Sequence, residues 1–339
     1  MVSTKEVKLE LSRRVGIVIQ PQFLDRQVRP RLGEEAWGNG SKWETRVVQL
    51  DGTGAATLEI TLDDRQKVFA KLYPNESGPA IYQKLKTLRA AGFGHDERYQ
   101  VVEPLGFIPE YGMLLTRGAE GPAVSAQICV DDAALLAGVR EAATWLAKLH
   151  GSPLRIGAPQ SLLDSGELLP LARRLAKTIC RWPEVTGLAL EMIRALEKLA
   201  VGTTEGLLVQ SHGQYRPIHV FISNATVTVI DLDRSRPCDP ARDVAEFLHR
   251  LRMTMFHHGS ASAADAATEA FLTAYTAAVG QTYLANLRFH WARYVFHSLN
   301  HKLLNHRPKD GNVGDLGMDS VVTFYRSEFE DAVQGRFGI

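Results

Sequence analysis

The sequence predicts an α+β protein with two lobes, a small β-rich lobe followed by a larger, mainly helical one. Strand-like runs, one helix and further strands succeed one another between residues 43 and 116. After Gly118 the pattern changes to long helices, whose apolar residues recur at intervals of three and four. The strand signals in this second half are a single pair at 219–231. We therefore expect an N-terminal lobe at 1–117 and a C-terminal lobe at 118–339, with a ligand in the cleft between them.

The small lobe is predicted from its turns and from one helix start. Asp51-Gly52 and Asp63-Asp64 are turn signals that separate short β-rich runs. Ser77 is a candidate N-cap, and Pro79 lies where the first turn of a helix accepts proline. Residues 1–35 show no pattern that assigns them to an element. Strands are expected at 46–50, 56–62, 67–73, 101–108 and 112–116, and a helix at 78–91.

The large lobe is predicted from helical stripes. Val139, Leu146 and Leu149 lie on one face of a helix that ends near His150. Comparable stripes occur at 162–176, 187–200, 241–253, 263–279 and 283–303.

Composition and charge exclude several classes of protein. With 45% hydrophobic and 23% charged residues, the chain has an ordinary globular composition. A net charge of +1 predicts neither a nucleic-acid nor a membrane partner. Cys129, Cys180 and Cys238 are widely spaced and odd in number, so we expect reduced thiols. The first residues lack an apolar core of signal-peptide length, which favours a cytoplasmic protein.

The most informative segments are a polar loop and the two aspartate-containing stretches that follow it. They read His212-Gly-Gln-Tyr-Arg-Pro-Ile-His219, Ile230-Asp-Leu-Asp233 and Asp239-Pro-Ala-Arg-Asp243-Val-Ala. In order and spacing they resemble the aminoglycoside phosphotransferase and choline-kinase-like family, whose pattern is roughly H-G-D-x-x-P-x-N, I-D-[WF]-[DE] and D-P-x-x-D-[LIV]-A. In outline the resemblance covers residues 43–300. It implies a bilobal protein-kinase-like fold that binds ATP or GTP with Mg²⁺ or Mn²⁺.

The resemblance implies roles for residues that would hold the nucleotide and its metal. Lys71, at the end of a strand, would bind phosphate, unless it is an ordinary exposed strand lysine. Asp231 would hold magnesium, a hard cation that prefers oxygen ligands, and Asp233 would be a second ligand. The alternative for Asp231 is an aspartate that caps a turn. Arg216 would contact a phosphate or form a surface salt bridge.

Two further residues are expected to support the loop and to do no chemistry. By the resemblance, His212 packs beneath the loop. Asp243, at the start of a helix, can accept hydrogen bonds from main-chain amides of the loop.

Two positions of the loop depart from the family pattern. Gln214 stands where the family has its catalytic aspartate. A neutral amide can orient a hydroxyl group but cannot accept its proton, and general-base assistance contributes about 10²–10⁴ in rate. His219 stands where the family has a magnesium-binding asparagine, and imidazole suits softer metals. A protonated His219 could instead pair with a phosphate oxygen.

The small lobe also departs from the pattern. The helix expected at 78–91 contains no Asp or Glu that could pair with Lys71, which leaves Glu76 or Gln83 as substitutes. A phosphate-binding glycine loop is also missing, because the scatter Gly33, Gly38 and Gly40 is typical of a plain loop.

Three functions remain open on the sequence. The first is a nucleotide-binding protein with impaired or lost catalysis, a pseudokinase. The second is an active atypical ATP-dependent kinase of small molecules, in which His219 or Asp233 replaces the usual aspartate. The third is a protein-interaction scaffold with a vestigial cleft. In the first two, main-chain groups at 114–117 are expected to bind the base.

A basic stretch late in the chain adds a hypothesis about the substrate. His297 and His301 have the i,i+4 spacing of a metal site, although a solvated or partner-facing helix face has the same pattern. If the late helices wall the substrate site, a basic and aromatic wall suits an anionic or sugar-like substrate. Its residues are His290, His306, Arg288, Arg293, Lys302, Arg307, Trp291, Tyr294 and Phe296.

Overall fold

The chain forms two compact units in a computed structural model. The structure describes residues 4–32, 42–50, 55–63, 67–128, 130–161, 165–203, 206–258, 261–305 and 316–337. The first unit comprises residues 1–121 with 221–232, and the second comprises 122–220 with 233–339. The chain thus first leaves the first unit after Gly121 and returns to it for one short segment. Cys129, Gly33, Gly38, Gly40, His306 and Arg307 lie outside the described residues.

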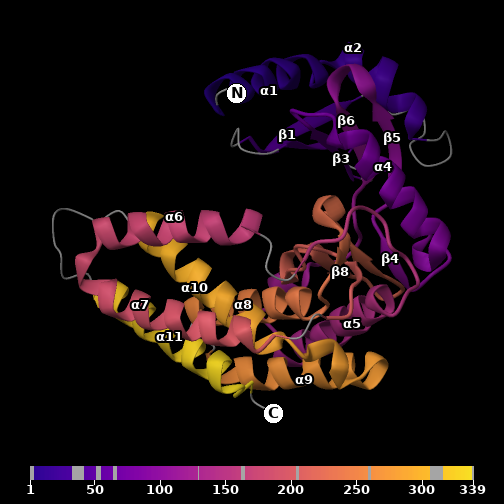
Figure 1. Ribbon diagram of the computed structural model, residues 1–339. Coiled ribbons are helices and arrows are strands. Elements are labelled where there is room, and N and C mark those ends of the chain that lie inside the picture. Colours follow the sequence, from indigo (N-terminus) through magenta and orange to yellow (C-terminus); the bar gives the residue numbers. More distant parts are fainter. Residues whose placement is uncertain are drawn as a thin grey trace. The chain divides into compact units, whose positions relative to one another are not determined.

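The first unit is built on a five-stranded antiparallel sheet (Figure 1). Its strand order is β1 (Trp43–Gln49), β2 (Ala56–Leu62), β3 (Lys67–Leu72), β6 (Met113–Arg117) and β5 (Pro104–Ile108). In β3, Val68 and Ala70 are buried in the core of this unit, while Lys71 is only partly buried. Because side chains alternate along a strand, Lys71 faces away from that core.

An N-terminal helix that the sequence did not reveal covers the core face of this sheet. Helix α1 (Thr4–Val18) continues through α2 (Pro21–Phe23), η1 (Leu24–Val28) and η2 (Arg29–Arg31). Leu11, Val15 and Val18 pack into the same core as the sheet. Their i, i+4, i+7 spacing is helical, but charged residues surround so narrow a stripe that it gives a weak signal.

The helix expected at 78–91 forms as α4 (Ser77–Leu88), followed by the π-turn η3 (Arg89–Phe93). The N-cap predicted at Ser77 is wrong, because Ser77 is already the first helical residue. The side chain of Asn75 accepts hydrogen bonds from the Ser77 amide at 3.2 Å and from its hydroxyl at 2.7 Å. Ile81, Leu85 and Leu88 form the buried face of the helix.

The returning segment completes a second, three-stranded sheet of order β4-β9-β8. Strand β4 (Tyr99–Val101) pairs in parallel with β9 (Val227–Val229), and β8 (Val220–Ile222) follows. The strand expected at 101–108 is therefore two strands, β4 and β5, interrupted at Val102 and Glu103. This pairing holds the end of β9, and hence Asp231, in the first unit.

The second unit is mainly helical, as the stripes predicted. Helices α5 (Asp132–His150) and α9 (Ala261–Val279) pack together, and α10 (Leu287–Asn305) packs against α6, α8 and α11 (Figure 1). The other helices are α6 (Ser165–Arg181), α7 (Thr186–Val201), α8 (Ala241–His257) and α11 (Leu316–Gln334).

Short elements of this unit surround the polar loop. Strands β7 (Val209–Ser211) and β10 (Arg236–Cys238) pair on either side of the loop. At three residues each they are too short to show a period of two, so the sequence analysis missed them. Single turns occur at η5 (Val124–Gln127), η6 (Pro183–Val185), η7 (Pro217–His219), η8 (Leu232–Arg234) and η9 (Gln281–Leu284), while η4 (Pro109–Tyr111) belongs to the first unit.

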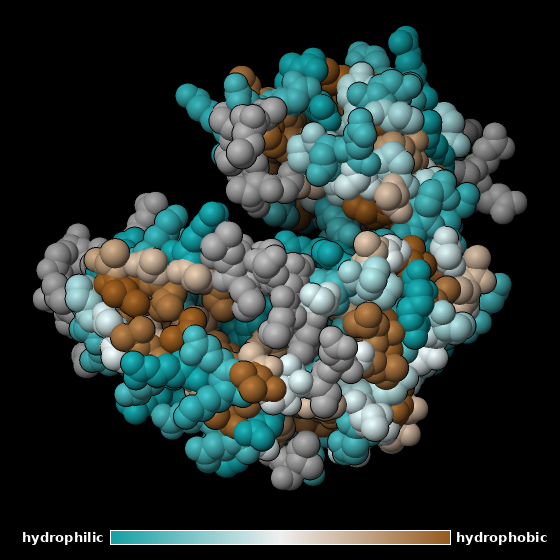
Figure 2. All heavy atoms as spheres, in the orientation of Figure 1, coloured by the Kyte–Doolittle hydropathy of each residue, from teal (hydrophilic) through white to brown (hydrophobic). Residues whose placement is uncertain are grey.

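The surface of the helical unit is mixed in polarity. On the face shown in Figure 2, apolar side chains gather near α6 and α7. Leu190 and Val201 of α7 are among the exposed large apolar residues. Among the described helices, none is both long enough and apolar enough to cross a membrane.

Candidate functional site

Lys71 and Asp231 form an ion pair in the first unit. Lys71 Nζ lies 2.7 Å from Asp231 Oδ1, and each side chain is a little over a quarter exposed (27% and 28%). The two residues are 160 positions apart in the chain. Lys71 lies on the side of β3 that faces away from the core, and the pairing of β9 with β4 fixes the position of Asp231, which follows β9. The structure thus brings together the two residues that the motif analysis assigned to phosphate and to metal.

The backbone of Asp231 adopts a rare conformation. Its φ of +64° lies in the left-handed region, where side chains other than those of Gly, Asn and Asp are strongly disfavoured. Such strain persists where the surrounding structure imposes it, and it gathers at functional sites. Asp63 also has a positive φ (+51°), so the conformation alone does not distinguish a metal ligand from an aspartate that caps a turn.

Helix α4 supplies a lysine to the same turn. Lys84 Nζ donates a hydrogen bond to the main-chain oxygen of Leu232 at 3.2 Å. The absence of a carboxylate from this helix is as predicted, and the carboxylate that the structure shows bonded to Lys71 is Asp231. Glu76, expected as a substitute partner, is the N-cap residue of α4. Lys84 was missed because nothing in a single sequence signals which helical lysine turns inward.

The carboxylate of Asp231 meets the chemical requirement for a magnesium ligand. Magnesium in nucleotide sites commonly uses one or two protein carboxylates together with phosphate oxygens. Among the described residues, no group of three or more His, Cys, Asp or Glu side chains could hold a metal by itself. A metal at Asp231 would therefore draw most of its ligands from a nucleotide and from water.

The polar loop belongs to the second unit, where Asp243 holds its main chain. Asp243 Oδ2 accepts from the His212 amide at 2.6 Å, and Oδ1 accepts from the Gly213 amide at 2.9 Å. His150 Nε2 lies 3.3 Å from Oδ2. Burial alone would raise the pKa of Asp243, but the bond from His150 and the loop amide bring the pKa below its usual value. The carboxylate is thus a fixed negative anchor for the loop.

Gly213 is required by the shape of this loop. Its φ is +82°, and a Cβ atom at this position would lie 2.3 Å from the main-chain oxygen of Arg234. Both the backbone conformation and the close approach exclude other residues.

Aromatic side chains support the loop from beneath. Tyr215 is fully buried, stacks on Trp145 at 5.7 Å and donates to the Ala142 oxygen at 2.7 Å. His212 is also fully buried, and its ring stacks on His219 at 5.8 Å. These contacts are those that the support role proposed for His212 requires.

Gln214 and Arg216 are joined in a short polar chain. When the Gln214 amide is turned to satisfy its neighbours, its oxygen accepts from Arg216 Nη2 at 2.7 Å. Arg216 Nε donates to Glu246 Oε1 at 2.7 Å, and Tyr294 Oη donates to Glu246 Oε2 at 3.0 Å. Because Glu246 is buried, Arg216 forms an internal ion pair rather than the surface salt bridge that the sequence left open.

The other two candidate residues have different surroundings. His219 is nearly buried, and its Nδ1 lies 3.0 Å from the main-chain oxygen of Gln214. Because a carbonyl oxygen only accepts, Nδ1 carries a proton, and Nε2 would carry the lone pair in the neutral form of the ring. Asp233 is partly buried in η8, at the first position of the second unit after the returning segment.

The basic and aromatic wall expected near residue 290 is only partly formed. Trp291 and Phe296 are buried core residues, with Trp291 stacked on Phe337 at 4.9 Å. Arg288 donates to the Val333 oxygen near the end of α11. Trp291 and Phe296 therefore serve packing, because α10 is covered by other helices, whereas Arg288 is exposed.

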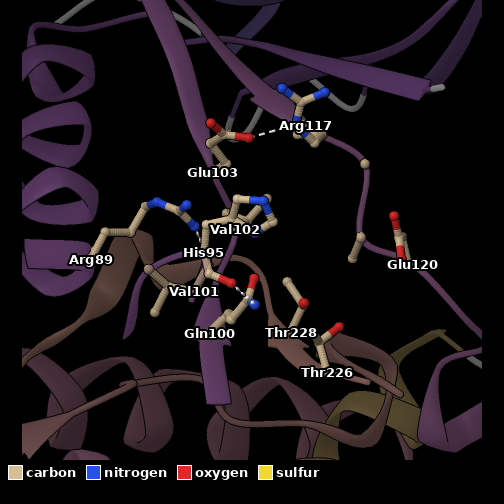
Figure 3. A pocket seen from close by; sticks show the side chains of 12 residues that line it. Arg89, His95, Gln100, Val101, Val102, Glu103, Arg117, Glu120, Thr226 and Thr228 are labelled. Carbon is tan, nitrogen blue, oxygen red and sulfur yellow. Dashed lines mark hydrogen bonds and ion pairs between the residues drawn. The ribbon is translucent and has the colours of Figure 1, made fainter. Parts of the chain in front are cut away.

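The cavity drawn in Figure 3 lies in the first unit and has a volume of about 330 Å³. Arg89 at its wall donates to the Val101 oxygen at 2.9 Å, and Arg117 pairs with Glu103. Its lining includes Arg117, the last residue of the segment expected to bind the base, but none of the residues assigned to phosphate, metal or the polar loop. The lining residues are Arg89, His95, Gln100, Val101, Val102, Glu103, Arg117, Gly118, Ala119, Glu120, Thr226 and Thr228.

The main chain expected to bind the base is committed to the sheet. Residues 114–117 lie in β6, which pairs with β3 on one side and β5 on the other. The Arg117 amide donates to the Glu103 oxygen, and the Gly118 amide donates to the Lys67 oxygen.

Comparison with known proteins assigns the family. A model of the phosphotransferase enzyme family matches residues 41–294, which is most of the chain. The chain belongs to this family and has its protein-kinase-like α+β fold. No curated protein matches it.

Solved structures share the fold at low identity. Choline kinase from Cryptosporidium parvum has a TM-score of 0.61 at 10% identity, covering 94% of this chain and 98% of that one. An ADP-bound aminoglycoside phosphotransferase, APH(2'')-Ib, has a TM-score of 0.53 at 13% identity, covering 91% of this chain and 99% of that one. The GDP complex of an aminoglycoside 2'-phosphotransferase has a TM-score of 0.56 at 12% identity, covering 92% of this chain and 99% of that one.

Proposed function

We propose that the chain binds a nucleoside triphosphate with Mg²⁺ or Mn²⁺ at Lys71 and Asp231, and that its phosphoryl transfer is impaired. The observation that carries the proposal is the ion pair between these residues, 2.7 Å long, with Asp231 in a strained left-handed conformation. Two structural relatives bind ADP and GDP respectively, which favours a nucleotide as the ligand.

The proposed binding geometry follows from charge. A divalent ion held by Asp231 would neutralise phosphate oxygens. Lys71 would donate to a phosphate oxygen from β3, and Lys84 would hold the turn after Asp231 through the Leu232 oxygen. A lysine in α4 in place of a carboxylate makes this part of the site more positive. That change favours the triphosphate over an uncharged ligand.

Impaired transfer follows from Gln214. Its amide is a hydrogen-bond partner of Arg216 and cannot accept the proton of an attacking hydroxyl group. Loss of general-base assistance lowers the rate by about 10²–10⁴ while leaving nucleotide binding intact. The proposed protein is therefore a nucleotide binder with slow or absent turnover, a pseudokinase.

A second candidate, an active atypical kinase, rests on His219. The hydrogen bond from Nδ1 to the Gln214 oxygen leaves Nε2 with the lone pair that a base needs. Asp233 would be the other candidate base. Removing His219 separates the two functions, because residual turnover would fall in the active kinase and stay unchanged in the pseudokinase.

The test is thermal stabilisation by ATP and GTP, each with magnesium and with manganese. A protein that binds only in its folded state gains stability as the free ligand exceeds its Kd. We expect a metal-dependent rise in Tm for the wild type that Asp231→Asn abolishes. Asp63→Asn is the matched control, since Asp63 also has a positive φ (+51°). If no nucleotide raises the Tm, the chain is a scaffold of kinase shape, and the proposal is wrong.

A further inference from the structure

Helices α6 and α8 of the second unit both pack against α10 (Figure 1), and all three carry cationic residues. Arg174 of α6 donates to His297 Nε2 of α10. His297 therefore accepts and is neutral. The pKa of His297 is lowered to about 4, chiefly by burial and then by the charges of Arg174, His301, Arg250 and Arg293. The positive charges near His297 thus disfavour its protonation, and Arg174 is the one of these residues hydrogen-bonded to the ring among the described residues.

The described carboxylates near this group of cations are bonded to other partners. In the described part of the chain, Glu246 is the carboxylate hydrogen-bonded beside it, and Arg216 and Tyr294 occupy its two oxygens. Glu328, on α11, is bonded to Arg252 by both oxygens. The neighbouring cations therefore share little negative charge.

Arg250 is the least compensated member. Its Nε is buried, and the structure gives its guanidinium no hydrogen bond to any described residue. Burial lowers its pKa, and the nearby charge of Arg216 lowers it further, while Glu246 acts in the opposite direction. Arg250 is partly buried, and burying its Nε without an acceptor is unfavourable; a phosphate or carboxylate group supplies the acceptor that it needs.

We infer that Arg174, Arg250 and His297 bind an anionic group, a phosphate or carboxylate, of the small molecule that the polar loop serves. The inference rests on the proposed function for its link to the loop. That link is the chain from Arg216 through Glu246 to Tyr294, which joins the loop to α8 and α10. A polycationic acceptor would be repelled by the same residues. The site thus defines an anionic substrate class.

The probe is inorganic phosphate, titrated at constant ionic strength and followed by the NMR signals of the histidine rings. We expect phosphate to raise the pKa of His297 and to bind with a measurable Kd. Arg250→Gln and Arg174→Gln should each weaken binding about tenfold or more, since each removes charge-assisted hydrogen bonds. Arg173→Gln, an exposed neighbour on the same helix, is the matched control and should leave the Kd unchanged.

Lys71→Gln separates this inference from the proposed nucleotide site. If phosphate binding survives Lys71→Gln but is lost in Arg250→Gln, the anion site stands, whatever ATP does. If binding is lost in Lys71→Gln and unchanged in both arginine variants, phosphate occupies the nucleotide site and the inference is wrong. Absence of any phosphate binding to the wild type also overturns it. Thermal unfolding of each variant verifies that it is folded.

Discussion

Lys71 Nζ and Asp231 Oδ1 are 2.7 Å apart within a single compact unit, although 160 residues separate them in the chain. The pair joins β3 to the turn after β9. It places the cation proposed to bind phosphate beside the carboxylate proposed to bind metal, and α4 contributes no carboxylate. Both residues of the proposed nucleotide site thus belong to this unit, while the altered position Gln214 lies on the loop of the other.

The conformation of Asp231 predicts an unusual order of stabilities. Because its φ is +64°, Asp231→Gly should be more stable than Asp231→Ala by about 1–2 kcal/mol. Urea unfolding of both variants measures the difference. Asp233, whose φ is not positive, is the control: there the alanine variant should be at least as stable as the glycine variant. Equal free energies of unfolding for the alanine and glycine variants of Asp231 would contradict the prediction of strain.

Lys84 should contribute to nucleotide affinity without being part of the family pattern. Lys84→Gln removes the charge that holds the Leu232 oxygen, and should weaken ATP binding about three- to tenfold, the range of one modest charge-assisted bond. Calorimetric titration measures the Kd. Lys86→Gln changes an exposed lysine two residues further along the same helix and should leave the Kd unaltered. Equal effects of the two variants would show a general charge effect instead.

Gln214→Asp should restore a proton acceptor to the loop. If impaired transfer follows from this residue, ADP release in the presence of a phosphate acceptor should rise, by up to about 10²–10⁴. Arg216, which contacts residue 214, would keep the new carboxylate ionised. Gln214→Asn, which keeps the amide, is the control. Wild-type turnover equal to that of the aspartate variant would favour His219 or Asp233 as the working base.

Asp243 should make stability depend on acidity. Its folded-state pKa is lowered, so its contribution is fully present above the unfolded-state pKa of about 3.9 and is lost as pH falls through the folded value. Asp243→Asn should cost about 3 kcal/mol at neutral pH, because the loop amides and His150 lose a buried charge. Urea unfolding at several pH values should show the gap to wild type closing below about pH 4. If the difference in stability between wild type and Asp243→Asn did not change with pH, the charge of Asp243 would not be what holds the loop.

The parts of the fold that the sequence predicts are those with a long period or a dense motif. The stripes after residue 118 predicted six helices, and the motif identified Lys71, Asp231 and the loop before contacts were known. Helix α1 escaped because its buried stripe is narrow, and β7 and β10 because three residues show no period. The expected division at residue 117 stays a prediction. The return of 221–232 to the first unit depends on the long-range β4–β9 pairing.

The candidate sites divide in the same way. Residues within a motif could be assigned roles from their order, whereas Lys84, Arg174 and Arg250 could not. Their importance comes from side-chain packing between separate helices, which no local pattern encodes. The reverse also holds, since Trp291 and Phe296 looked functional in sequence and are buried in the core.

The most direct test of the account is calorimetric titration of ATP into the wild-type protein and into Lys71→Gln, each with and without magnesium. The account predicts one binding site in the wild type that requires magnesium and is weakened at least tenfold by Lys71→Gln, because the lysine beside Asp231 donates to phosphate. Binding of ATP that is indifferent to both magnesium and Lys71, or no binding at all, would contradict it.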